Sequence, residues 1–104
     1  MASLVSQPQP ISAFKALGDE ARWQIMRYAS SVDEVCRGDL QADLALSKPA
    51  LMNHLGVLTA AGLLHRRHVG RVTYYSVNPA VLVEASRALT AAGQQSNARS
   101  RIIA

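Results

Sequence analysis

The sequence predicts a mainly α-helical domain with one small β-hairpin, built from about five helices and a two-stranded wing. Apolar side chains recur at the three- and four-residue spacing of helices along most of the chain. Between about residues 63 and 77 this spacing gives way to β-branched and aromatic residues around a glycine, a pattern typical of a hairpin. A length of 104 residues fits one domain with a modest core, so pairing with a second copy would stabilise it.

Composition argues against a membrane or secreted protein. No uncharged apolar run approaches the roughly 18 residues that a membrane span requires. The start MASLVSQPQP lacks a basic region followed by an apolar block, and a single Cys cannot form a disulfide within one chain. We therefore expect a cytoplasmic protein with no membrane partner.

Two helices are expected to open the domain, after a flexible segment of residues 1–10 that shows no apolar period. One apolar face of the first helix consists of Ile11, Phe14 and Leu17. Gly18 interrupts that helix, and Asp19 is expected to cap a second one over about 19–30. The inward residues of the second helix are expected to be Ile25, Met26 and Ala29.

Two short helices follow at close spacing. Asp39 is expected to cap the first, which carries Leu40 and Leu44. Ser47 is expected to cap the second after a three-residue turn. Two short helices joined so tightly are typical of a helix-turn-helix motif.

The helix of about 48–61 has two different sides, and Gly62 is expected to end it. Its core stripe consists of Leu51, Leu55 and Leu58, at i, i+4 and i+7. At about 100° per residue, the opposite side and its flanks hold Pro49, Ala50, Met52 and Asn53. His54 lies beside the core stripe, where we expect packing or a phosphate contact rather than a metal.

The residues after Gly62 read LLHRRH, VGR and VTYYSV, which predicts a wing whose exposed part spans residues 65–72. Because side chains alternate along a strand, Tyr74 and Tyr75 are expected to face opposite sides. Asn78 and Pro79 are expected to start the last helix.

The last helix carries an apolar stripe for which so small a domain has no internal partner. The stripe consists of Val81, Leu82, Ala85, Ala88, Leu89 and Ala92. We expect a second subunit to cover it, together with the first helix. The predicted limits are therefore a domain of residues 11–92 and a flexible polar tail of 93–104.

Charge is distributed unevenly along the chain. Residues 44–83 hold Lys48, Arg66, Arg67 and Arg71 with no acidic side chain, and they also hold all three His residues. This segment is suited to a polyanion, although a solvated basic face would give the same pattern.

A helix-turn-helix followed by a basic hairpin is a winged helix in outline, in which one helix enters the DNA major groove and the hairpin lies along the backbone. Asn53 has the donor and acceptor that an adenine edge requires, and Met52 or Ala50 would touch a thymine methyl. Lys48, at the positive helix start, suits a phosphate or guanine. The three wing arginines are expected to bind phosphates. Taken singly, the same residues also fit a solvated surface.

Several segments in order resemble the ArsR/SmtB family of bacterial winged-helix repressors, over about residues 11–90. They are FKALGDEARWQIMRY, EVCRGDL, LSKPALMNHLGVLTAAGLL and RRHVGRVTYYSV. The resemblance implies a homodimer, paired through its first and last helices, that binds an inverted repeat in operator DNA until an effector lowers its affinity. By matched position, the residues nearest the bases are Lys48, Pro49, Ala50, Met52, Asn53 and His54.

The chain departs from the family pattern at positions that matter for sensing. Metal-sensing members resemble ELCVCDL where this chain has EVCRGDL, so Gly38 stands in place of a second thiol beside Cys36. The last helix offers only Glu84 and no His, so neither location can gather within one subunit the four ligands that zinc prefers. Two other departures, Ala45 for a usual Gly and Gly56 for a common basic residue, predict an altered turn and one phosphate contact fewer.

The function predicted is a dimeric, sequence-specific DNA-binding repressor that uses no cofactor or metal. An enzyme is not expected, because no carboxylate pair, nucleophile with its base, or phosphate-binding glycine loop is evident. The alternative is a winged-helix dimerisation or protein-interaction module without DNA readout. Cys36 is either a packed thiol or a redox sensor beside Arg37, and the sequence identifies no inducer.

Overall fold

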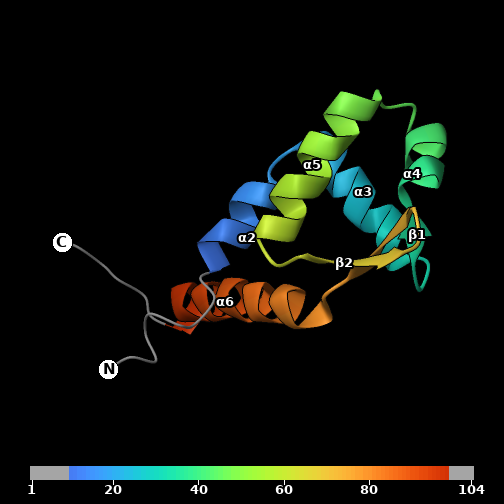
Figure 1. The fold of residues 1–104 in the computed structure, drawn as a ribbon. Helices are drawn as coiled ribbons and strands as arrows, with labels where there is room; N and C mark the ends of the chain where they lie inside the picture. Colours follow the sequence, from blue (N-terminus) through green and yellow to red (C-terminus); the bar gives the residue numbers. More distant parts are fainter. Residues whose placement is uncertain (1–9, 99–104) are drawn as a thin grey trace.

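The structure, a computed structural model, describes residues 10–98 (Figure 1). Its helices are α2 (Pro10–Leu17), α3 (Glu20–Ser30), α4 (Arg37–Leu44), α5 (Lys48–Ala60) and α6 (Pro79–Ala98). Its strands are β1 (Val35–Cys36), β2 (Leu64–Val69) and β3 (Val72–Val77). The predicted fold class, a mainly α-helical winged helix-turn-helix, is confirmed.

Polar side chains begin three helices at the places that the sequence predicts. Asp19 Oδ1 accepts a hydrogen bond from the Arg22 amide at 3.1 Å, and Ser47 Oγ accepts one from the Ala50 amide at 3.3 Å. Each bond satisfies an amide that has no partner within the first turn of its helix. Asn78 starts α6, with Oδ1 3.3 Å from the amide of the second helical residue.

The start of α4 differs from the prediction. The helix begins at Arg37 with Cys36 in the capping position, where its side chain makes no capping hydrogen bond. Asp39 therefore lies inside the first turn, where a carboxylate favours the positive end of the helix dipole. The reason is β1, which pairs with β3 and keeps the backbone extended through Cys36 until the helix starts.

The hairpin belongs to a three-stranded antiparallel sheet of order β1-β3-β2, rather than to an isolated pair. Tyr75 lies opposite Val35 on one side and Arg66 on the other, so the central strand is β3. The two-residue turn between β2 and β3 begins with Gly70, whose φ of 60° is accessible to glycine at little cost.

The core lies between the leucine face of α5 and the elements that surround it. Leu51, Leu55 and Leu58 are all buried, as predicted, and so are Tyr75 and the expected inward residues of α3. In α2 the buried residues are Ala13 and Ala16, because these small side chains allow close helix packing. Of the predicted apolar face of α2, Phe14 and Leu17 are half-buried against the edge of the core, whereas Ile11 is 57% exposed.

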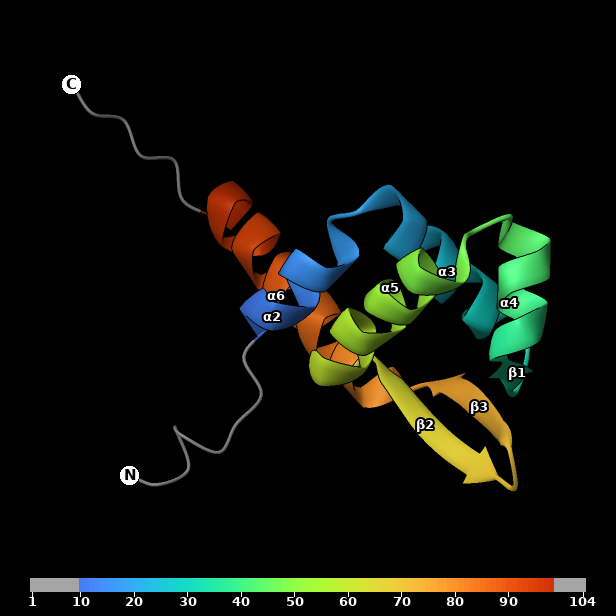
Figure 2. The same ribbon diagram turned by 45° about the horizontal axis from the view of Figure 1, so that its top comes forward.

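The two ends of the described chain pack together. Helices α2 and α6 lie side by side, while the hairpin extends in the opposite direction toward α4 and β1 (Figures 1 and 2). The polar run after Gly93, expected to be a flexible tail, is helical as far as Ala98, and residues 99–104 lie outside the described residues. No helix within 10–98 has the length and apolar character needed to cross a membrane.

Candidate nucleic-acid interface

The outward side of α5 is exposed in the arrangement that the sequence predicts. Asn53 is exposed and Met52 is 39% exposed, while Leu51 and Leu55 on the other side are buried. The other predicted base-contacting positions at the start of the helix are Lys48 and Pro49, both exposed, and Ala50, half-buried. The side chains proposed to contact DNA bases therefore lie on the solvent-exposed face of α5, and the opposite face of this helix is buried in the core.

The wing arginines are exposed but lie on two faces of the sheet. Arg66 pairs with Tyr75 and Arg67 with Tyr74, and directly opposed residues in antiparallel strands share a face. Because Tyr75 is buried, Arg66 lies on the core side of the sheet and Arg67 on the other. Arg71 is exposed at the turn.

Arg67 is not a free cation. Its Nε and Nη2 donate to the two carboxylate oxygens of Glu34 at 2.8 and 2.6 Å, and its guanidinium lies 5.1 Å from the centre of the Tyr74 ring. The Arg67 hydrogen bonds hold the pKa of Glu34 below its usual range, and Glu34 raises the pKa of Arg67. Sequence reasoning missed Glu34 because it lies 33 residues from Arg67, and only the pairing of β1 with β3 brings them together.

His54 faces α3 rather than solvent. Its Nδ1 lies 3.3 Å from Nη1 of Arg22, and the ring is half-buried. Of the two roles expected for His54, packing therefore fits better than a phosphate contact. Arg22 was not singled out in the sequence, because no local pattern connects residues 32 positions apart.

An apolar hollow of about 440 Å³ lies between α2, α3 and α6. It is lined by Phe14, Leu17, Gly18, Trp23, Leu82, Ala85, Ser86 and Leu89. Leu89 is 62% exposed and Trp23 is 49% exposed, and large apolar side chains exposed together on one surface often mark an interaction site. Sequence reasoning missed Trp23, although its position outside the inward stripe of α3 was a usable signal.

The residues predicted to form the dimer interface differ in how they are placed. Phe14, Leu17, Leu82 and Leu89 line the hollow. Ala85 also lines the hollow, at its base, where it is 5% exposed. Ile11 is exposed but does not line the hollow, while Val81 and Ala88 are half-buried on α6.

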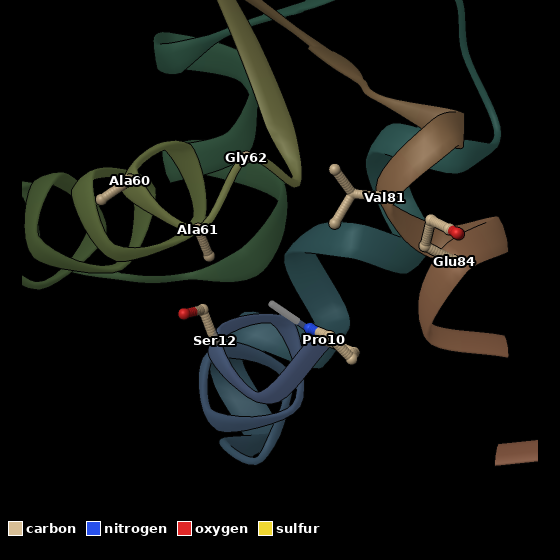
Figure 3. Close-up of a pocket in the computed structure, with 7 residues that line it drawn as sticks. All are labelled: Pro10, Ser12, Ala60, Ala61, Gly62, Val81 and Glu84. Carbon is tan, nitrogen blue, oxygen red and sulfur yellow. The ribbon is translucent and has the colours of Figure 1, made fainter. Parts of the chain in front are cut away.

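A smaller hollow of about 260 Å³ lies where the end of α5 meets α2 and α6 (Figure 3). Its walls are mainly small or apolar, with Ser12 and Glu84 as the polar side chains among the residues in the figure. One carboxylate and one hydroxyl do not form a metal site or a catalytic pair.

Comparison with known proteins agrees with this architecture. The chain is 36% identical over 70 residues to the arsenic resistance transcriptional regulator ArsR2 of Pseudomonas putida, covering 67% of this chain and 61% of that protein. It is 32% identical over 71 residues to the transcriptional repressor SdpR of Bacillus subtilis, covering 68% and 78%. The chain belongs to the ArsR/SmtB family.

A solved ArsR-like transcriptional regulator from Rhodococcus sp. RHA1 superposes with a TM-score of 0.77 at 32% identity, covering 86% of this chain and 84% of that chain. No family model matches the chain. All three similar proteins are named as regulators of transcription, which supports a DNA-binding regulator for this member of the ArsR/SmtB family.

Within one subunit, the two positions where the ArsR/SmtB resemblance implies metal sites supply too few ligands for a metal ion. Cys36 is half-buried between β1 and α4, with Gly38 in place of a second thiol, and Glu84 has no His beside it on α6. Within residues 10–98 no three His, Cys, Asp or Glu side chains gather closely enough to hold a metal ion. Zinc requires about four such ligands.

Proposed function

We propose that the chain forms a cytoplasmic homodimer that represses transcription by binding an inverted repeat in operator DNA, and that it does not sense metals. The observation that carries the proposal is the two-sided packing of α5, which buries its leucines and exposes Met52 and Asn53. A helix that exposes small and amide side chains, with few charges, is suited to entering the major groove. Its relatives include proteins named as transcriptional repressors.

Each exposed side chain has a role that its chemistry supports. Asn53 would pair with an adenine edge, while Ala50 and Met52 would contact thymine methyl groups. Lys48, near the helix start where Pro49 enters the first turn, would bind a phosphate or a guanine. These contacts would supply the sequence preference, because phosphate contacts alone carry no base information.

The wing would supply electrostatic affinity. Arg66 and Arg71 make no hydrogen bond to another described side chain, so their full charge is available to phosphates. Arg67 would contribute less, because Glu34 already neutralises it. Each phosphate that is neutralised releases counterions, so affinity should fall as salt rises.

Dimerisation would cover the apolar hollow beside α6. Exposed Trp23 and Leu89 would be removed from water, at about 25 cal/mol for each Å² of apolar area buried. A two-fold axis through this surface would place two copies of α5 on one duplex, which matches the symmetry of an inverted repeat.

The decisive experiment is selection of duplexes by the protein from a library with a random 30-base-pair core, followed by titration of the winning sequence at two salt concentrations. We expect enrichment of a palindrome and a complex that weakens steeply with salt. A winged-helix module without DNA readout would enrich no sequence. Asn53→Ala should lose about 1 to 3 kcal/mol of discrimination at one base in each half-site, whereas Gln24→Ala, an equally exposed amide on α3, should lose none.

A further inference from the structure

Side chains on both sides of the outward face of α5 contact the neighbouring helices α3 and α4. On the side of α4, Nη1 of Arg37 lies 3.7 Å from Sδ of Met52. On the side of α3, Nη1 of Arg22 lies 3.3 Å from Nδ1 of His54. Asn53 lies between Met52 and His54 in the sequence, so its two immediate neighbours on α5 make these contacts.

Arg22 is itself held firmly. Its Nε donates to the carbonyl oxygen of Ala16 at 2.6 Å, in the last turn of α2, where helix carbonyls have no partner within their own helix. Its backbone amide donates to Asp19, and this bond, with smaller contributions from the Arg22 and His54 charges, lowers the pKa of the Asp19 carboxyl. One half-buried guanidinium thus connects the end of α2, the start of α3 and the flank of α5.

The contact between Arg22 and His54 requires one protonation state of the imidazole. A guanidinium only donates hydrogen bonds, so Nδ1 of His54 must accept and carry no proton. Protonation of Nδ1 would replace the hydrogen bond with two facing cations. Two other charged groups lie near this contact. Asp19 stands at the start of α3, and Lys15 of α2 lines the same hollow as Arg22.

A small rotation of α5 about its axis would move Asn53 out of hydrogen-bonding distance of a base. Helix side chains end about 5 to 6 Å from the helix axis, so a rotation of about 10° moves a side-chain tip by about 1 Å. The useful range of hydrogen-bond distances is only about 0.5 Å wide. Phosphate contacts made by long flexible arginines tolerate such a movement better than a two-point contact from Asn53 to a base.

We propose that Arg22 is a positioning residue for DNA recognition, which sets the rotation of α5 through His54 and so aims Asn53 at its base. The inference rests on the proposed function and adds to it a residue that does not itself touch DNA. It predicts different effects on sequence-specific and on non-specific DNA affinity. Loss of the contact should reduce affinity for the selected sequence while leaving affinity for unrelated DNA unchanged.

Arg22→Lys tests this with the charge retained. A single ammonium has no fork with which to bond both the Ala16 carbonyl and His54, so the tie to α5 is lost. We expect the ratio of affinities for the selected duplex and for poly(dI-dC) to fall about tenfold, with the salt slope unchanged. Arg87→Lys, the same exchange at an exposed position of α6, should leave the ratio at its wild-type value.

His54→Asn supplies a second measurement that a purely structural role would not move. Its amide oxygen would lie close to the position of Nδ1 and cannot gain a proton. The affinity ratio of His54→Asn should therefore stay near the wild-type value, whereas that of His54→Leu, which offers Arg22 no acceptor, should fall as it does in Arg22→Lys.

The outcomes separate the alternatives. An unchanged ratio in Arg22→Lys, whether or not the variant is less stable in urea, would overturn the positioning role while leaving the repressor proposal intact. A flatter salt slope with equal losses on both DNAs would make Arg22 a phosphate contact instead. If the wild type selects no sequence, both proposals fall.

Discussion

Ala45 occupies a backbone conformation that normally favours glycine. It ends α4 with φ of 54° and ψ of 40°, in the left-handed region, and it is the residue that leads into the turn before α5. For a residue with a Cβ this conformation costs about 1 to 2 kcal/mol. The sequence predicted an altered turn because Ala45 replaces a usual glycine. Ala45 instead adopts the left-handed conformation that the turn requires, and its backbone is therefore strained.

Ala45→Gly should stabilise the protein. Relief of the left-handed strain contributes about 1 to 2 kcal/mol, and the greater freedom of glycine in the unfolded chain removes about 0.5 to 1 kcal/mol of this. The Ala45 methyl group is exposed, so no core packing is lost. The expected net gain is about 0.5 to 1 kcal/mol, or an increase in Tm of about 2 to 8 °C for a domain of this size.

The assay is urea denaturation followed by circular dichroism, at one fixed protein concentration because a dimer's stability depends on it. Ala42→Gly is the matched control: it deletes the same exposed methyl group three residues earlier, within α4, where glycine should cost about 1 kcal/mol. The two variants should thus shift the midpoint in opposite directions. A shift in the same direction for both would refute the assignment of strain to Ala45.

Three further predictions concern the dimer, the wing and pH. Leu89→Asp places a charge on the exposed side of α6 and should give folded monomers by sedimentation; a dimer of wild-type affinity would contradict the proposed interface. Arg66→Ala should reduce the salt slope of DNA binding by about one, and Arg67→Ala by less because Glu34 already holds that cation; equal slopes would show that Glu34 yields to phosphate. The Asp19 carboxylate, with its lowered pKa, stabilises the fold above its unfolded-state pKa of about 3.9 and loses this effect as pH falls below it. The gap in urea midpoint between the wild type and Asp19→Asn should therefore shrink from pH 6 to pH 3, and a constant gap would exclude the charge as its cause.

Local chemistry made much of the fold predictable. The caps at Asp19, Ser47 and Asn78 depend on side chains within three residues of the amides that they bond, and the leucine stripe of α5 is a property of one helix. These signals act over a few residues, so they can be recognised in the amino-acid sequence without the structure. The exposure of Met52 and Asn53 followed directly, because burial of one helix face determines the position of the other.

Other features depended on segments far apart in the chain. A two-residue strand has no period to detect, so β1 emerged only from its pairing with β3, and this pairing moved the start of α4 to Arg37. The helical extension of α6 to Ala98 was likewise missed, because a polar run without an apolar period looks the same in a helix and in a tail.

The amino-acid order alone predicted the winged-helix class, the helix α5 with one buried and one outward side, and the basic hairpin. The tertiary structure decided which of the charged residues are free to act: Arg67 is held by Glu34, and Arg22 holds His54. The physical reason is that periodicity and capping are short-range properties, whereas the partner of an arginine depends on how strands and helices more than thirty residues apart come to lie beside one another.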